Sequence, residues 1–324
     1  MIDRAIYFPY IRVPENEWFT RILLYWDKIG TITPSEYAEE PQRLGNYMAD
    51  LISNNLLETI IPAKYIHEIP NWLGSFLDMI DNNQEITHRR GVALERGETT
   101  LIHIEKFSPI VEDLKDRGLA IEARDPWYNV ERKTAELYMA YLSSALGSIE
   151  ELQMTPITDK DDSLSAFEIA HPTAKAVSSM QFKMIEKLLP SPQIGIPVKE
   201  IIEFKNENYD LLKQFRRHIE HQINTLVLID DEYIRNREFQ LIQEELNNDI
   251  KEIEKKMKRK WRKILYGLVK SIGLGVPVGV AISSGNIPQI LIALYNAWNG
   301  SQNIQTRLSE KPIAYAAFAK LKFR

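Results

Sequence analysis

The chain contains no cysteine among its 324 residues. Disulfide bonds, thiolate catalysis and zinc or iron–sulfur centres held by cysteine are therefore excluded. A reducing compartment such as the cytosol fits this composition. The first residues, Met1-Ile2-Asp3-Arg4-Ala5, lack the basic and apolar regions of a secretory signal, so we expect a cytoplasmic protein.

Several motifs for phosphate binding and nucleophilic catalysis are also missing. The chain has no glycine-rich loop that ends in Lys-Ser or Lys-Thr, and it has no dinucleotide-binding glycine fingerprint. It also lacks the Gly-x-Ser-x-Gly elbow that presents the nucleophile of many serine hydrolases. P-loop NTPases, nucleotide-dependent dehydrogenases and serine hydrolases therefore have no support in the sequence.

Charge is distributed unevenly along the chain. Residues 1–162 hold 16 Lys and Arg against 28 Asp and Glu, whereas residues 163–324 hold 24 against 17. A chain of this length is long for one hydrophobic core, so we expect an acidic domain at 1–162 and a basic domain at 163–324. The two domains could attract each other within one molecule or between copies, or the basic one could bind phosphates of lipid or nucleic acid.

The acidic half alternates between strand and helix patterns. Short β-rich runs occur near 5–11, 29–33, 57–61, 99–104, 119–123 and 153–157, and stretches with helical spacing of apolar residues separate them. Asn129 is expected to cap a helix that continues to Leu146, and residues 81–98 are expected to form an exposed loop. This alternation predicts parallel βαβ units, and so an α/β domain with a mostly parallel sheet.

Acidic residues follow three of the predicted strands. Glu105 and Lys106 come after the fourth strand, Asp125 after the fifth and Asp159 after the sixth. Functional groups gather at strand ends in such sheets, so three carboxylates could hold Mg²⁺ or Mn²⁺ for phosphodiester chemistry, with Lys106 steadying a phosphate. The alternative is that the acids cap the helices that follow them and that Asp125 belongs to an Asp-Pro turn. His103 lies inside an apolar strand and is expected to be packed.

The basic half is predicted to be helical. From residue 226 to 262 the pattern is charged and amphipathic, with apolar residues every three or four positions: Ile234, Phe239, Ile242, Leu246, Ile250, Ile253 and Met257. Such a stripe is typical of a long helix that packs in a bundle or a coiled coil. We therefore expect an all-α C-terminal domain, with self-association as the second interpretation of the stripe.

A basic run directly precedes a long apolar stretch. The run holds Lys255, Lys256, Lys258, Arg259, Lys260, Arg262 and Lys263, and residues 264–300 after it carry a single charge, Lys270. A membrane surface, a nucleic acid or a partner protein could each be contacted by residues 255–298. Two buried helices of a soluble core produce the same pattern, and the glycines and Pro277 within 264–283 argue against a spanning helix.

Two strings near the N-terminus, AIYFPYI at 5–11 and LLYWDKI at 23–29, resemble an uncharacterised bacterial protein family. Similar strings occur at 104–107, 138–142, 155–159 and 204–217, so the resemblance covers residues 4–220. It implies a bacterial or phage-borne cytosolic protein, and it brings no established activity or site.

These features favour a bacterial effector or partner-binding protein, with defence against phage as one setting. Its α/β half would bind a partner, and its helical half would self-associate or contact a membrane or another protein. A metal-dependent nuclease or phosphohydrolase that uses Mg²⁺ at the strand-end carboxylates is one alternative, and a non-catalytic scaffold is another. Whether the chain is an enzyme stays open. We expect a cytoplasmic location, or a peripheral one at the inner membrane.

Overall fold

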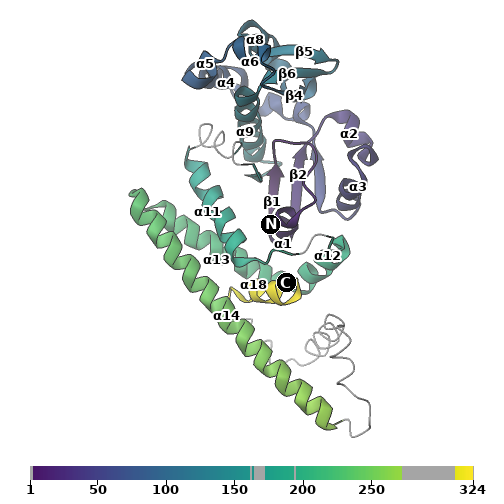
Figure 1. Cartoon of the computed structure of the whole chain (residues 1–324), viewed down its shortest axis with the longest axis vertical. Coiled ribbons are helices and arrows are strands. Elements are labelled where there is room, and N and C mark those ends of the chain that lie inside the picture. Colours follow the sequence, from purple (N-terminus) through teal and green to yellow (C-terminus); the bar gives the residue numbers. More distant parts are fainter. Residues whose placement is uncertain (1–2, 161–162, 164–171, 193–194, 272–310, 324) are drawn as a thin grey trace. The chain divides into compact units, whose positions relative to one another are not determined.

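The structure is a computed structural model that describes residues 3–160, 163, 172–192, 195–271 and 311–323 (Figure 1). The chain divides into two compact units. The α/β unit comprises Met1–Phe182 and Pro192–Glu203, and the helical unit comprises Lys183–Ser191 and Phe204–Arg324. The division falls inside helix α11 (Pro172–Leu188), beyond the expected boundary between residues 162 and 163.

The α/β unit contains the predicted parallel sheet. Its strands are β1 (Arg4–Tyr7), β2 (Lys28–Ile32), β3 (Leu57–Ile60) and β7 (Met154–Ile157), in the order β3-β2-β1-β7. Every neighbouring pair is parallel. Parallel sheets are buried on both faces, which explains why the central strands are buried along all but their first residue. The predicted α/β fold class is confirmed.

Helices connect the first three strands. Helix α1 (Glu17–Tyr25) links β1 to β2, and α2 (Ser35–Glu39), the 3₁₀ turn η1 (Pro41–Leu44) and α3 (Asn46–Ser53) link β2 to β3. In the sheet, β1 therefore lies between β2 and β7. The chain passes from β1 to β2 directly, but it returns to the other side of β1, as β7, only after it has formed β3. In open α/β sheets, ligands bind where the strand order reverses in this way, outside the carboxyl ends of the strands.

Residues 61–153 form an insertion between β3 and β7 that has a sheet of its own. Strands β4 (Thr99–His103), β5 (Ala120–Arg124) and β6 (Trp127–Glu131) are antiparallel and lie in the order β4-β6-β5. The prediction that the runs near 99–104 and 119–123 belong to parallel βαβ units is therefore wrong. Only Asp125 and Pro126 join β5 to β6, and a crossover to a parallel strand needs a dozen residues or more.

The helix expected to begin at Asn129 begins instead at Arg132. Asn129 lies within β6, and the buried Glu131 is the N-cap of α9 (Arg132–Ser148). The Glu131 carboxylate accepts hydrogen bonds from the backbone N of Thr134 at 2.7 Å and from its hydroxyl at 2.8 Å. The aromatic and β-branched residues from Trp127 to Val130 favour a strand, and cross-strand packing outweighs the capping preference of asparagine.

Short helices complete the insertion. They are α4 (Trp72–Asp81), α5 (Gln84–His88), α6 (Val92–Glu95), α7 (Ile104–Phe107) and α8 (Val111–Asp116), with 3₁₀ turns η2 (Pro62–Lys64), η3 (Ile66–Glu68) and η4 (Ser108–Ile110). Their apolar residues share one core with Ile102 of β4, Val130 of β6 and much of α9. The insertion thus has its own packed interior, continuous with the parallel sheet through α9.

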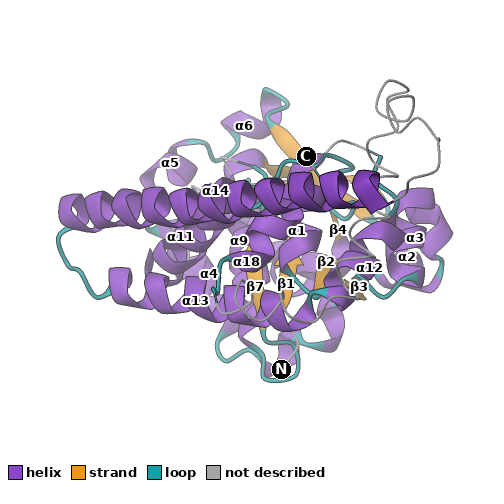
Figure 2. Ribbon diagram, turned by 90° about the horizontal axis from the view of Figure 1, so that it is seen from below, coloured by secondary structure: helices purple, strands orange, loops and turns teal. Residues whose placement is uncertain are grey.

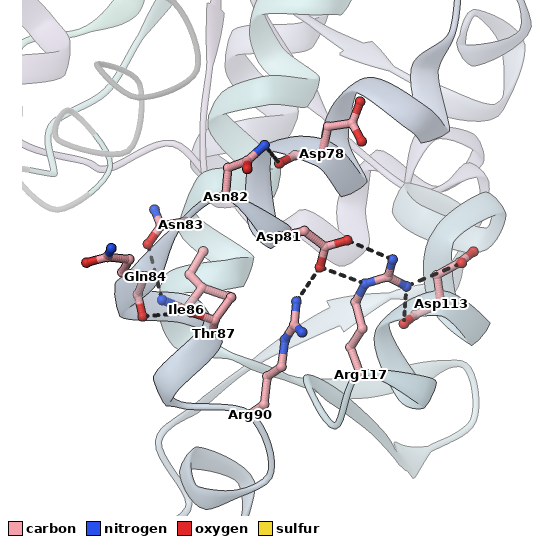
Figure 3. A network of polar contacts seen from close by, with 10 residues as sticks. All are labelled: Asp78, Asp81, Asn82, Asn83, Gln84, Ile86, Thr87, Arg90, Asp113 and Arg117. Atoms are coloured by element: carbon pink, nitrogen blue, oxygen red, sulfur yellow. Dashed lines mark hydrogen bonds and ion pairs between the residues drawn. The ribbon is translucent and has the colours of Figure 1, made fainter.

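Ion pairs hold α4, α8 and the turn before α6 together (Figure 3). Asp81 at the end of α4 accepts hydrogen bonds from Arg90 and Arg117, and the contact from Arg117 Nη2 is 3.0 Å long. Arg117 also lies 3.5 Å from Asp113 of α8. The hydrogen bond from Arg117, followed by that from Arg90, lowers the pKa of the Asp81 carboxyl group. The expected exposed loop at 81–98 is therefore partly helical and anchored at Asp81.

Helix α9 approaches β7 closely at Gly147. A Cβ atom added there would collide with the backbone carbonyl oxygen of Met154, which cannot turn aside as a side chain can. We expect Gly147→Ala to lower the free energy of unfolding by about 2 kcal/mol, as overpacking does. In the interior of a helix, Gly→Ala ordinarily raises the free energy of unfolding by up to about 1 kcal/mol. The loss expected at Gly147 is therefore opposite in sign to the usual effect. Urea unfolding would measure the difference.

Gly74→Ala in α4 is the matched control. A Cβ atom there would meet only the exposed side chain of Asn71, which can rotate away. We expect its effect on the free energy of unfolding to stay within about 0.5 kcal/mol. Unchanged stability in Gly147→Ala would contradict the close approach of α9 to β7.

The helical unit confirms the predicted helical C-terminal region. Helices α13 (Tyr209–Val227), α14 (Glu232–Ser271) and α18 (Ala314–Lys322) pack against one another, and Figure 2 shows α14 as one unbroken helix. Aromatic rings lie at the centre of this unit. Phe204, from α12 (Val198–Glu207), and Phe215 of α13 both contact the ring of Tyr315 in α18.

Most of the predicted apolar stripe of α14 is buried. Five of its residues face the interior of the helical unit: Phe239, Leu246, Ile250, Ile253 and Met257. Ile242 is half-buried, and Ile234 is exposed. The stripe therefore packs within its own unit, as the first interpretation expected, and leaves the opposite face of α14 free of the described helices.

Only part of the basic run and the apolar tail lies within the described residues. The positions of the run, 255–263, all belong to α14, which ends at Ser271. Residues 272–310, the greater part of the predicted tail, lie outside the described residues. No helix in the described part of the chain is both long and apolar enough to cross a membrane.

Candidate functional site

The short helix α7 brings Glu105 to the carboxyl end of the parallel sheet. Ser35, which opens α2 directly after β2, donates to Glu105 from its backbone N and its hydroxyl, both at 2.7 Å. Burial raises the pKa of Glu105, but these two hydrogen bonds and the nearby His103 bring it below its ordinary value. Glu105 therefore caps α2 as an ionised carboxylate, and not the helix that follows it, which is what the capping alternative expected.

Lys106, the next residue of α7, is buried, with only 4% of its surface exposed. Burial alone lowers the pKa of its amino group from 10.5 to about 7. No ion pair or hydrogen bond engages the amino group among the described residues, whereas the hydroxyl of Tyr138 donates to the Lys106 backbone oxygen. A lysine in this state is partly neutral near neutral pH, and an unprotonated amine can act as a base or a nucleophile.

His103 lies beside these residues at the end of β4. Its Nδ1 accepts a hydrogen bond from the backbone N of Glu105 at 3.3 Å, so the neutral ring carries its proton on Nε2. Nε2 is buried and has no hydrogen-bond partner within the described residues, and Glu36 Oε1 lies 3.6 Å away. Burial lowers the pKa of His103, while Glu105 and Glu36 oppose that shift. The ring packs edge-on against Trp127, as expected for a packed histidine.

Ser35, Glu36, His103, Glu105 and Lys106 together form what we call the carboxyl-edge cluster. Ser35 and Glu36 of the cluster follow the carboxyl end of β2. α7, which carries Glu105 and Lys106, also contacts η2, the turn that follows the carboxyl end of β3. The cluster therefore lies where α/β sheets usually hold their functional groups. Groups with shifted pKa values concentrate at functional sites, and this cluster contains a buried lysine and a buried histidine with lowered pKa values.

Asp159 lies at the other candidate position, the switch point formed by the ends of β1 and β7. Its Oδ1 accepts a hydrogen bond from the hydroxyl of Tyr7 at 2.8 Å, and its Oδ2 lies 3.0 Å from Lys160 Nζ. Burial and then Asp159 raise the pKa of the Tyr7 hydroxyl. The amino group of Lys160 also lies over the ring of Tyr10. The polar side chains at this switch point are thus engaged with one another.

The predicted metal site does not form among the described residues. Asp125 is exposed and occupies the turn between β5 and β6, as the Asp-Pro alternative expected. Both oxygens of Glu105 are engaged by Ser35, and Asp159 is engaged by Tyr7 and Lys160. No group of three or more His, Asp or Glu residues in the described part of the chain is placed to hold a metal ion. Glu105, Asp125 and Asp159 therefore do not make up a joint Mg²⁺ or Mn²⁺ site.

A cavity of about 170 Å³ lies beside α1 and α3, and no pattern in the sequence indicated it. Glu15, Tyr47 and Asp50 line it together with Ile196 and Val198. Burial, then Glu15 and Asp50, raise the pKa of the Tyr47 hydroxyl. Ligand pockets usually measure about 300–1,000 Å³, so this cavity is too small for a drug-sized molecule.

The predicted contact residues of the basic run begin at an exposed position of α14. Lys255 and Lys256 are both exposed, and Lys256 Nζ forms an ion pair with Glu252 one turn earlier. Lys258, Arg259, Lys260, Arg262 and Lys263 follow in the same helix. The run is therefore a continuous helical segment and not a loop.

Comparisons of the chain with protein-family models, with curated proteins and with solved structures found no match. The resemblance over residues 4–220 therefore stays a prediction, and the function has to be inferred from this chain's own residues.

Proposed function

We propose that this chain is a partner-binding effector whose helical unit makes the contact through α14. The observation that carries the proposal is the position of its exposed apolar side chains. Leu228, Tyr233, Ile234 and Leu241 lie within 14 residues of sequence, and Tyr233 and Leu228 are 76% and 81% exposed. We call these four residues the α13–α14 tip, because they occupy the turn between the two helices and the first turns of α14.

Single exposed apolar residues are ordinary, but a group of them marks a contact surface. The described part of the chain exposes nine large apolar residues, and four of them form the tip. Each buried square ångström of apolar surface contributes roughly 25 cal/mol, and tyrosine is enriched among residues that dominate binding energy. The tip therefore offers enough apolar surface to anchor a partner.

Charged groups next to the tip would give the contact its specificity. Asp230, Asp231 and Glu232 are exposed and separate Leu228 from Tyr233. Acidic groups around an apolar anchor favour a partner with basic residues at the rim of an apolar surface. The basic run at 255–263, farther along α14, would favour acidic or phosphate-bearing partners in the same way.

A photoreactive amino acid in place of Tyr233 should form covalent adducts with a protein when cells that make the full-length chain are irradiated. The same amino acid in place of Leu101 is the control, because Leu101 is 56% exposed on β4 and lies far from the tip in sequence. Leu241→Glu should remove the adduct at position 233 while the chain stays folded, since Leu241 is half-exposed.

Equal labelling at positions 233 and 101 would overturn the proposal, and so would a complete absence of protein adducts at position 233. The electrophoretic mass of each adduct, before and after Leu241→Glu, is the quantity to compare.

A further inference from the structure

We infer that the carboxyl-edge cluster is a reactive site, at which Lys106 forms a Schiff base with small uncharged aldehydes or ketones. The cluster belongs to the α/β unit, so this inference does not depend on the proposed contact of the helical unit. Two buried side chains carry it, because Lys106 and His103 are both almost fully buried. Neither the Lys106 amino group nor His103 Nε2 has a hydrogen-bond partner among the described residues.

His103 and Lys106 lie on the same side of the first turn of α7. His103 is the N-cap of this helix and Lys106 is its third residue, a spacing at which two side chains meet in a capping box. The electrostatics agree with this placement. Burial is the main reason for the lowered pKa of His103, and the positive charge of Lys106 lowers it further. One small molecule can therefore meet a nucleophile and a hydrogen-bond donor together.

The hydrogen bonding of His103 determines what kind of group the site accepts. Its Nδ1 accepts a hydrogen bond from the backbone N of Glu105 at 3.3 Å, so the neutral ring carries its proton on Nε2 and donates there. A bound molecule therefore has to present an acceptor, such as a carbonyl oxygen. A metal ion does not fit, because it would need a lone pair on Nε2.

The charges around the cluster favour an uncharged carbonyl compound over a keto acid. Burial lowers the pKa of His103, whereas three nearby carboxylates oppose that shift: those of Glu105, Glu36 and Asp125. Their negative charges would repel an anionic substrate. Of the turns that pack against α7, η2 adds the exposed Lys64 and η4 has no charged residue.

Glu36 is the group that an entering molecule has to displace. Its side chain is partly exposed, and its Oε1 lies 3.6 Å from the buried Nε2 of His103. That distance is too long for a hydrogen bond, so no bond has to break when Glu36 moves away. Its other oxygen, Oε2, already lies 3.3 Å from Arg43 Nη1, which can hold the carboxylate on the outer side.

The covalent step balances within the site. The lone pair of the Lys106 amine forms a bond to the carbonyl carbon, and the electrons of the C=O bond move to the oxygen that Nε2–H of His103 holds. The two hydrogens of the amine leave with that oxygen as one water molecule, and a C=N bond remains. Burial lowers the pKa of Lys106 to about 7, so about half of the amine is unprotonated and nucleophilic at pH 7.

Propanal with sodium cyanoborohydride tests the site in the full-length chain. Cyanoborohydride adds hydride to the imine carbon and solvent supplies a proton, so a Schiff base becomes a stable propyl-lysine that peptide mass spectrometry locates. Lys64, an exposed lysine of the same unit, is the internal reference. An ordinary lysine is unprotonated in roughly one molecule in 3,000 at pH 7. We therefore expect Lys106 to be labelled at least about tenfold faster than Lys64 at pH 7, with a midpoint near that pH.

Two variants test the roles of the neighbouring side chains. His103→Phe keeps an aromatic ring beside Trp127 and removes the Nε2 donor, so labelling of Lys106 should slow by at least about tenfold while its pH midpoint stays. Glu36→Ala should speed it, because it removes the side chain that has to move. The rate at Lys64 should not change in either variant, and circular dichroism would confirm that both keep the fold.

The wild type alone decides the inference, even if a variant does not fold. Labelling of Lys106 that never exceeds that of Lys64 at pH 7 would overturn it, and so would a midpoint near pH 10.5. Wild-type labelling rates in a folded His103→Phe would remove the assigned role of His103. None of these results bears on the adducts at position 233, so the proposed function stands or fails separately.

Discussion

Lys106→Met should raise the stability of the protein at pH 6 by on the order of 3–5 kcal/mol. Lys106 is buried, and burial lowers the pKa of its amino group from 10.5 to about 7. Each pKa unit corresponds to about 1.4 kcal/mol, so keeping the charged amine inside the folded protein costs several kcal/mol. Methionine has a similar length and no charge, which removes that cost while filling the same space.

The pH dependence separates this cost from ordinary packing effects. Between pH 7 and pH 10.5 the unfolded chain keeps the Lys106 proton that the folded protein has released, so the stability of the wild type rises with pH in this window. The variant lacks that contribution. The difference in the free energy of unfolding between Lys106→Met and the wild type should therefore be largest below pH 7. It should shrink towards zero near pH 10.5. Urea unfolding of both proteins at several pH values would measure it.

Lys64→Met provides the control, because Lys64 is an exposed lysine of the same unit. We expect its effect to stay within about 0.5 kcal/mol at every pH. If Lys106→Met destabilised the protein at pH 6, or if its effect did not change with pH, the buried charge would have been assigned wrongly.

A lysine retained at a cost in stability would direct attention to the carboxyl-edge cluster. Proteins often accept destabilised groups where function requires them. Here Lys106, whose amine is partly neutral near pH 7, lies at the carboxyl end of β2 together with His103, whose Nε2 has no hydrogen-bond partner among the described residues. This is the usual location of sites in α/β sheets. The expected gain at pH 6 would therefore make Lys106 the first residue to probe for chemistry, ahead of Asp125 and Asp159.

The parallel sheet could be predicted from the sequence because each strand carries its own local signal. The runs near Ile6, Ile29, Ile60 and Ile157 are apolar, short and separated by helical spacing, and all four became strands of one sheet. The antiparallel sheet of the insertion was missed because alternation identifies a strand but not its neighbour. The two-residue connection at Asp125 and Pro126 held the missing information, since it is long enough only for a hairpin.

The site could be predicted only in part, because its contacts join residues far apart in the chain. The position of Glu105 after a strand was visible, but its partner Ser35 follows a different strand 70 residues earlier. The burial of Lys106 had no sequence signal, since lysine is almost always exposed. Local sequence patterns therefore indicated that polar residues follow the strands. They could not indicate which of these residues contact one another in the fold.

Helix α14 shows how a small error of phase changes the interpretation of a surface. The sequence grouped Ile234 with Phe239 and Leu246 in one apolar stripe, yet Ile234 is 48% exposed. Phe239 follows Ile234 by five positions, a spacing that turns a helix well away from the original face. Ile234 is instead one of the exposed apolar residues of the α13–α14 tip, which is where the proposed contact lies.

Leu246→Glu together with Ile250→Glu should lower the free energy of unfolding by at least about 5 kcal/mol, the largest effect expected for this chain. Leu246 is 7% exposed and Ile250 is fully buried, at the part of α14 that packs against α13 and α18. Each glutamate would place an unpaired charge in an apolar interior, at a cost of several kcal/mol. Loss of helical circular dichroism and an earlier urea transition would report it.

Ile234→Glu together with Leu241→Glu is the matched variant on the exposed side of the same helix. Both positions are about half-exposed, so in dilute protein we expect the free energy of unfolding to change by less than about 1 kcal/mol. The same variant should lose the covalent adduct at position 233, because it replaces two apolar residues of the α13–α14 tip with charge. If the inner variant kept the wild-type stability, Leu246 and Ile250 would face solvent, and the assignment of inner and outer faces of α14 would have to be reversed.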